Sequence, residues 1–202
     1  MTRSIPEPQN ARSRRTRLAI LAATRALLEE QGLPALTMAA VAERVGVSRR
    51  GLYLHFGSRG ELVTALFDYL AGEEGLDASL RQVWAAEDSV AALTEWARHL
   101  ARYHPRVLAV DQAVQQVRRQ DADADRHHRR ASGAQLANCR RLTEWLARER
   151  RLAEPWTVET GADLLWSLVS SEVIAGLLNE RNWSQEELGD RLATLYRRTL
   201  TA

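Results

Sequence analysis

The 202-residue chain contains no lysine, and all 28 of its basic residues are arginine. This excludes enzymes that need a lysine to bind a nucleotide phosphate in a glycine-rich loop, to form a Schiff base or to complete a Ser-Lys pair. Cys139 is the single cysteine, so neither an intramolecular disulfide nor a site with several cysteine ligands can form. Its apolar neighbours indicate a buried thiol rather than a redox sensor. The sequence predicts no metal and no cofactor.

Long apolar runs and alternating strand patterns are also missing. No run approaches the length needed to cross a bilayer, and the N-terminus lacks the apolar core of a signal peptide, so we expect a cytoplasmic protein. The pattern beyond residue 60 is helical throughout, and Pro34, Pro105 and Pro155 are predicted to separate helices. Because 45% of the residues are hydrophobic, the chain can bury a core. The sequence therefore predicts an all-α fold.

Charge is distributed unevenly along the chain. Through Arg59 there are ten arginines and four acids, a net charge of +6, whereas residues 60–202 hold 18 arginines and 22 acids, a net charge of −4. A basic segment joined to a mildly acidic body is typical of a DNA-binding module attached to a regulatory one.

Residues 37–67 read TMAAVAERVGVSRRGLYLHFGSRGELVTALF and have the pattern of a helix-turn-helix. Thr37 and Ser48 stand where a side-chain oxygen can cap the first backbone N–H groups of a helix. Gly46 supplies the left-handed backbone that ends the first helix, two residues before the second begins. A turn this short fixes the angle between the two helices.

The second of these helices has one apolar side, formed by Leu52 and Phe56. Arg49 and Arg50 lie in its first turn, where a recognition helix enters the major groove and an arginine can donate two hydrogen bonds to guanine. The alternative is a solvated arginine pair with no partner. Positive charge opposes the helix dipole at this end, so DNA binding explains the position better. Leu54 can contact a thymine methyl. The predicted base-contacting residues are Arg49, Arg50, Gly51 and Leu54.

Residues 1–13 are predicted to form a flexible arm, because they contain Pro6 and Pro8 and few apolar residues. An arginine-rich arm beside a major-groove helix commonly follows phosphates or enters a narrow minor groove. Arg14 and Arg15, at the end of this arm, are predicted phosphate contacts. The alternative is that the first ten residues are a leader without function.

The segment from Arg14 to Phe67 resembles the DNA-binding domain of the tetracycline-repressor (TetR) family. The resemblance rests on the Thr-led helix, the Gly-Val-Ser turn at 46–48, the Leu-Tyr-x-His-Phe run at 52–56 and the Ser-Arg-x-x-Leu run at 58–62. Arg50-Gly51 departs from the family, in which a glycine followed by a small hydroxyl residue is common. The resemblance implies about nine helices, a DNA-binding domain at 14–58 and an effector-binding and dimerisation domain at 59–202. It also implies phosphate contacts from Tyr53, His55 and Arg59, with help from Thr37 and Ser48.

Near the C-terminus, residues 157–181 are predicted to form one helix that is apolar nearly all round, followed by a last amphipathic helix. A helix with two apolar faces can pack on the core with one face and on a partner with the other. The resemblance implies that these helices form a four-helix bundle in a homodimer, which would bind a palindromic operator. The alternative is a larger monomeric core. The predicted interface comprises Leu164, Leu168, Ala175, Leu188, Leu192, Leu195 and Tyr196.

All six tryptophans lie outside the predicted DNA-binding domain. Aromatic walls with a few polar groups are usual in a small-molecule pocket, although most such aromatics in a helical domain are core. The candidate pocket residues are Trp96, His99, Tyr103, Asp111, Gln115, Arg118, Trp145, Trp166 and Ser170. The run DADADRHHRR at 121–130 lacks the glycine and the distal glutamate of a calcium loop, so we interpret it as a solvated loop before a helix from about 125 to 150.

No catalytic motif such as HExxH or a supported Ser-His-Asp grouping is present, so the sequence predicts no enzyme. It predicts a homodimeric DNA-binding repressor of a palindromic operator, released by a small, largely apolar or aromatic effector. The alternative is a ligand-independent DNA-binding regulator or architectural protein whose body is a protein-interaction module.

Overall fold

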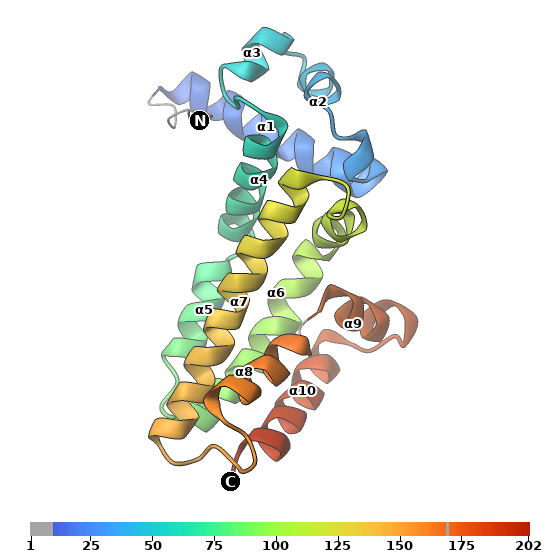
Figure 1. The fold of residues 1–202 in the computed structure, drawn as a ribbon. Coiled ribbons are helices and arrows are strands. Elements are labelled where there is room, and N and C mark those ends of the chain that lie inside the picture. The colour runs from blue at the N-terminus through green and yellow to red at the C-terminus, as the bar shows by residue number, and fades with distance from the viewer. Residues whose placement is uncertain (1–9, 169) are drawn as a thin grey trace. The chain divides into compact units, whose positions relative to one another are not determined.

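The computed structural model describes residues 10–168 and 170–202, and these residues form ten α-helices with two short helical segments of other types (Figure 1). The α-helices are α1 (Ala11–Gln31), α2 (Met38–Val45), α3 (Arg49–Tyr53), α4 (Arg59–Glu73), α5 (Leu76–Trp84), α6 (Ser89–Val117), α7 (Ala122–Arg148), α8 (Val158–Ser167), α9 (Ser171–Ala175) and α10 (Gln185–Leu200). A 3₁₀ turn, η1, spans Leu33–Ala35, and a π turn, η2, spans Gly176–Glu180. The described residues contain no strand beyond an isolated bridge between Leu152 and Thr201. The all-α prediction is confirmed.

The helices divide into two compact units. The first unit holds the described residues up to Ala71 together with Ala109–Arg129, and the second holds Gly72–Leu108 and Arg130–Ala202. The sequence boundary was expected at residue 59, but α4 belongs to the first unit as far as Ala71. The reason is that the apolar side of α4 is buried there, through Leu62, Val63, Leu66 and Leu70.

The second unit has a continuous apolar core, in which Trp96 and Tyr196 are the largest buried side chains. Close packing of α8 depends on Gly161, since a Cβ at this position would lie 3.1 Å from Cγ2 of Thr143 on α7. The hydroxyl of Thr143 in turn donates to the Val158 carbonyl at 2.9 Å. Each such contact fixes α8 against α7.

The predicted helix at 157–181 is interrupted. The structure ends α8 at Ser167 and starts α9 at Ser171, because the Ser170 hydroxyl accepts a hydrogen bond from the Val173 N–H at 3.2 Å and so begins a new helix. The two segments are bent by 46°. No single helix among the described residues is long and apolar enough to cross a membrane; only this bent pair meets that test by length and composition.

Two other helix limits differ from the sequence prediction. Pro105 lies inside α6 instead of ending it, and the buried Leu100, Ala101 and Leu108 on either side offset the hydrogen bond that proline cannot make. The run that begins at Asp121 is helical and not a loop. The Asp121 carboxylate accepts hydrogen bonds from the N–H groups of Asp123 and Ala124, and α7 starts at Ala122.

The predicted arm overlaps the first helix. Residues 1–9 lie outside the described part of the chain. Asn10 accepts a hydrogen bond from the Ser13 N–H at 2.7 Å and caps α1, so residues 11–13 are helical. Arg14 and Arg15 therefore project from a helix and not from an extended segment.

Candidate DNA-binding interface

The predicted helix-turn-helix is formed by α2 and α3. Thr37 caps α2 by accepting from the Ala40 N–H at 3.0 Å, and Ser48 caps α3 by accepting from the Gly51 N–H at the same distance. Between them Gly46 has a φ of 73°, in the left-handed region that suits glycine. The predicted caps and turn are confirmed. Thr37 and Ser48 can still donate their hydroxyl protons, since each oxygen acts only as an acceptor in its cap.

The short helix α3 presents two different sides. Leu52 and the following Phe56 are fully buried. Arg49 and Arg50 are exposed in its first turn, Leu54 is 70% exposed, and Gly51 is half-buried under the Ser48 hydroxyl. The four predicted base-contacting residues thus occur within the six residues 49–54, a segment that the buried Leu52 and Phe56 anchor on its apolar side.

Tyr53 lies within this segment and His55 directly follows it. Tyr53 is 44% exposed, which leaves its hydroxyl accessible. Partial burial, and then the neighbouring positive charge of Arg17, lower the pKa of His55 below its ordinary value. His55 is therefore neutral near pH 7 and can serve a phosphate as a hydrogen-bond donor, without adding a full charge.

Arg59, a predicted phosphate contact, also makes three hydrogen bonds within the first unit. Its Nε donates to the Leu36 carbonyl at 2.9 Å and its Nη2 to the Leu33 carbonyl at 3.3 Å, while Nη1 pairs with the Asp121 carboxylate. The guanidinium thus links the start of α4 to η1, to the residue after it and to the cap of α7. These contacts use three of the five guanidinium N–H donors inside the first unit, and the phosphate contact of Arg59 stays a prediction.

Arg17 lies on α1 close to the exposed Arg14 and Arg15, but its side chain turns inward. Its Nη1 donates to the His55 carbonyl at 2.7 Å, and its guanidinium lies 4.2 Å from the centre of the Phe56 ring. A signal for this was present in the sequence, since Arg17 is three, four and seven residues before the buried Ile20, Leu21 and Thr24. Its place on the inner face of α1 went unrecognised.

The predicted pocket residues do not form a single group. Trp96 and His99 are buried in the second unit. The His99 ring stacks on Tyr103 at a centroid distance of 5.7 Å and lies tilted by 31° against Trp96 at 5.1 Å. Trp145 and Trp166 lie in the same unit but point their N–H groups at Glu149 and Ser132, and Trp166 is 40% exposed. Ser170 caps α9. The remaining candidates, Asp111, Gln115 and Arg118, belong to the first unit. There the side chain of Gln115 forms a hydrogen bond with the ring of His128 at 3.0 Å.

His99 is held in its neutral form. Ser79 Oγ accepts from Arg102 at 3.1 Å, so its own proton is free to point at His99 Nδ1, 2.9 Å away. Burial, and then the charges of His104 and Arg102, lower the pKa of His99 to about 3. This imidazole is uncharged at neutral pH and links α5 to α6 through its hydrogen bond with Ser79.

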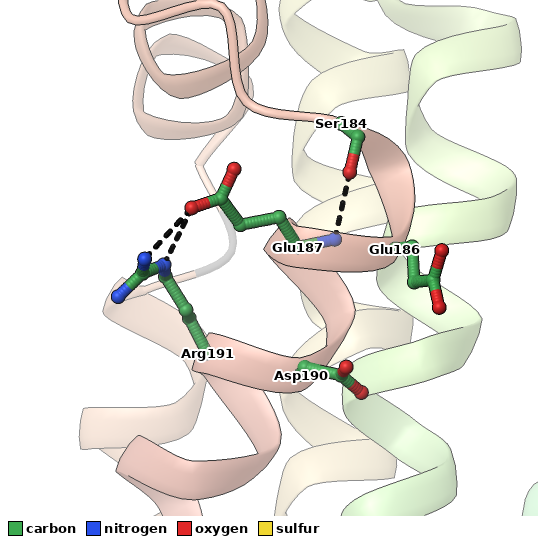
Figure 2. Close-up of a pocket in the computed structure, with 5 residues that line it drawn as sticks. All are labelled: Ser184, Glu186, Glu187, Asp190 and Arg191. Atoms are coloured by element: carbon green, nitrogen blue, oxygen red, sulfur yellow. Dashed lines mark hydrogen bonds and ion pairs between the residues drawn. The ribbon is translucent and has the colours of Figure 1, made fainter.

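A surface depression of about 400 Å³ lies at the start of α10 (Figure 2). Figure 2 shows Ser184 capping the helix through the Glu187 N–H, and the Glu187 carboxylate paired with Arg191. None of the predicted pocket residues lines it. In the described part of the chain, no group of three or more His, Cys, Asp or Glu residues could hold a metal ion.

The predicted dimer interface combines buried and exposed side chains. Leu188, Leu192, Tyr196 and Ala175 are already buried within the single chain, so they leave little surface for a partner. Periodicity identified an apolar face but not which apolar face is internal. Leu195 is 44% exposed, and Leu164 and Leu168 are half-buried. Two further large apolar side chains of the second unit are exposed, Trp166 and Val173, and neither was among the predicted interface residues.

A helix-turn-helix with an exposed arginine pair at the start of its second helix, attached to a helical second unit, defines a DNA-binding regulatory protein. Residues 20–66 match the profile described as bacterial regulatory proteins, tetR family. The DNA-binding segment of the chain thus matches the model of this family, and the resemblance inferred from the sequence is confirmed.

Solved structures show the same fold. NalD from Pseudomonas aeruginosa, the secondary repressor of the MexAB-OprM multidrug efflux pump, is 16% identical over 95% of this chain and 98% of its own, with a TM-score of 0.74. A regulator from Saccharomonospora viridis, solved in complex with choline, is 13% identical over 93% and 98%, with a TM-score of 0.73. A TetR transcription regulator from Haloarcula marismortui is 16% identical over 93% and 99%, with a TM-score of 0.72. No curated protein sequence matches.

Proposed function

We propose that the chain is a cytoplasmic, homodimeric transcriptional repressor that binds a palindromic operator and is released by a small, largely apolar or aromatic effector. The observation that carries this proposal is the exposed Arg49-Arg50 pair on a helix whose other side is anchored by Leu52 and Phe56. Such a helix can enter the major groove without losing its own support.

In this proposal Arg49 and Arg50 donate to guanine O6 and N7, and Leu54 contacts a thymine methyl. Gly51 allows close approach of the backbone to the bases. Phosphates are contacted by the exposed Arg14 and Arg15 on α1 and by the groups around α3. The proposed phosphate contacts around α3 are Thr37, Ser48, Tyr53 and His55.

The exposed apolar side chains of the second unit support the homodimer. Trp166, Val173 and Leu195 are each about two-fifths exposed, although large apolar side chains gain free energy by leaving water. We assign them to the interface, together with the half-buried Leu164 and Leu168. Two-fold symmetry then places two copies of α3 about one DNA turn apart, which requires a palindrome.

The core of the second unit supports an effector site. The Trp96 Nε1, Ser171 Oγ and Tyr196 Oη atoms are buried there and have no hydrogen-bond partner among the described residues. Buried donors without partners are rare and cost free energy. An apolar molecule with one or more acceptor atoms could satisfy them. The choline bound to the Saccharomonospora viridis protein makes quaternary ammonium compounds a first group to test, since aromatic faces bind such cations.

One observation favours the second candidate, a ligand-independent regulator with a protein-interaction body. The depression at Ser184–Arg191 is open and charged, and the aromatic side chains Trp96 and His99 are closed in the core. The exposed Trp166, Val173 and Leu195 could then contact another protein. Saturable binding of a small molecule that weakens DNA binding would separate the two functions.

The proposal is tested by titrating the protein, at fixed salt, onto a duplex that it selects from a random-sequence pool and onto the scrambled duplex. Arg50→Ala should weaken binding to the selected duplex by about 1–3 kcal/mol and relax preference at one base pair. Arg14→Ala should weaken both duplexes similarly. Equal losses for Arg50→Ala on both duplexes would contradict the base-contacting role.

A further inference from the structure

Arg17 connects α1 to the carboxyl end of the recognition helix. Its Nη1 donates to the carbonyl of His55, two residues after α3 ends, at 2.7 Å. The same guanidinium lies 4.2 Å from the centre of the fully buried Phe56 ring. A planar guanidinium can form both contacts at once, whereas a lysine ammonium lacks the flat surface for stacking.

Helix α3 depends on such external contacts. It has five residues, little more than one turn, and a helix of this length is not stable by its own hydrogen bonds. Ser48 fixes its amino end through the Gly51 N–H. At the carboxyl end the chain turns through Leu54, His55 and Phe56, whose N–H groups are satisfied by α3. The His55 carbonyl is the acceptor that Arg17 takes.

We propose that Arg17 is a positioning residue for DNA recognition: it sets the angle at which α3 presents Arg49 and Arg50, and it is not a phosphate ligand. This inference rests on the proposed function. Arg17 acts on the arginine pair through the turn that ends α3. Its neighbours Arg14 and Arg15 are exposed on the same helix and act on phosphates directly.

The contact also provides a spectroscopic reporter. The charge of Arg17 contributes, after partial burial, to the lowered pKa of His55. Loss of the charge should therefore raise the pKa of His55, and the imidazole proton resonances report this by NMR titration without any DNA.

The experiment compares wild type with Arg17→Met, Arg17→Lys and Arg15→Met, the last being a matched loss of charge from the exposed side of α1. Affinity is measured at several salt concentrations, on a duplex selected by the wild-type protein from a random-sequence pool and on its scrambled form. The His55 pKa and thermal unfolding are measured on the same samples.

If Arg17 is a positioning residue, Arg17→Met should weaken binding to the selected duplex about tenfold and leave its salt dependence almost unchanged. Binding to the scrambled duplex should change little. The pKa of His55 should rise. Arg17→Lys should keep the His55 pKa low and recover only part of the affinity. Arg15→Met should weaken binding to both duplexes, lower the slope of log K against log salt by about 0.9 for each bound protomer and leave the pKa of His55 unchanged.

Two results would overturn the inference. If Arg17→Met weakened binding to both duplexes equally and lowered the salt slope by about 0.9 for each bound protomer, Arg17 would be a phosphate ligand. If its affinity for the selected duplex stayed within about twofold of wild type, the contact would not position α3. If the wild type selected no duplex, the proposed function would fail and with it the recognition role of Arg17; an unchanged His55 pKa in Arg17→Met would by itself refute the contact.

Discussion

The carboxylate of Asp121 pairs with the guanidinium of Arg59, and it also caps α7 through the N–H groups of Asp123 and Ala124. One carboxylate therefore joins the starts of α4 and α7. Partial burial opposes its ionisation, but the bond from Arg59 and those from the backbone lower the pKa of Asp121 below its ordinary value. The ion pair holds the first unit together just behind the helix-turn-helix.

Asp121→Asn should lower the free energy of unfolding by about 1–2 kcal/mol, because asparagine keeps the cap and loses the ion pair. Asp125→Asn is the control: its partner Arg129 is exposed, and such surface pairs contribute about 0.5 kcal/mol or less. Urea unfolding at neutral pH measures both. Since the pKa of Asp121 is lowered, its contribution is lost as pH falls through that pKa, so the difference should vanish in acid. Equal stability of both variants would refute the role of this pair.

The cap of the recognition helix should matter for both stability and DNA binding. Ser48→Ala removes the acceptor for the Gly51 N–H and should cost about 1 kcal/mol of unfolding free energy. Ser48→Asp keeps an acceptor at this position, so it should retain stability but weaken DNA binding, because the added negative charge faces phosphates. Chemical unfolding and DNA titration separate the two effects. If Ser48→Asp bound DNA as tightly as wild type, α3 would not approach the backbone of the duplex.

The second unit should become less stable in mild acid because of His99. Its pKa is about 3 in the folded protein and about 6.5 when unfolded, so the unfolded state binds more protons below pH 6.5 and stability falls with pH. At pH 5 the protonation of His99 in the unfolded state should lower the free energy of unfolding by about 2 kcal/mol relative to neutral pH.

His99→Gln is the matched variant, since it can still pair with Ser79 but cannot take up the proton. His104, whose pKa burial lowers to about 4, acts in the same direction, so the difference between wild type and His99→Gln is the quantity to measure. Urea unfolding at pH 7.5 and pH 5 gives it. Parallel losses in the two proteins would show that His99 does not control this pH dependence.

Local features were predictable from the sequence, and long-range ones were not. The caps by Thr37 and Ser48 depend on residues three positions away, and the burial of Leu52 and Phe56 follows from helical spacing. The partners of Arg17 are backbone and ring atoms close to 40 residues further along the chain, whose positions only the fold defines. Composition alone therefore does not distinguish an inward-facing arginine such as Arg17 from one that contacts DNA.

The same limit applies to the pocket and the interface. An apolar stripe shows that a helix face avoids water, but two apolar faces on one helix look alike in sequence. The structure buries Leu188 and Tyr196 and exposes Leu195 on the same helix. Aromatic side chains such as Trp96 were predicted to line a pocket because of their type, whereas their packing places them in the core.

The exposed apolar side chains of the second unit lead to a prediction about assembly. Leu195→Arg adds a charge at a side chain that is 44% exposed in the single chain, so the variant should fold. If this side chain lies in a homodimer interface, association would bury the new charge without a partner. A charge buried at an interface without a partner costs several kcal/mol of binding free energy, so dimer affinity should fall by about a hundredfold or more.

Leu18→Arg is the matched control, because Leu18 is 51% exposed but lies on α1 in the first unit. Sedimentation velocity over a range of concentrations should show wild type and Leu18→Arg as dimers under conditions in which Leu195→Arg is a monomer. The monomer should also lose tight binding to a palindrome while keeping binding to a half-site, because the two copies of α3 would no longer be linked. A dimeric Leu195→Arg would place the interface elsewhere on the chain, and dissociation of Leu18→Arg would place it on α1.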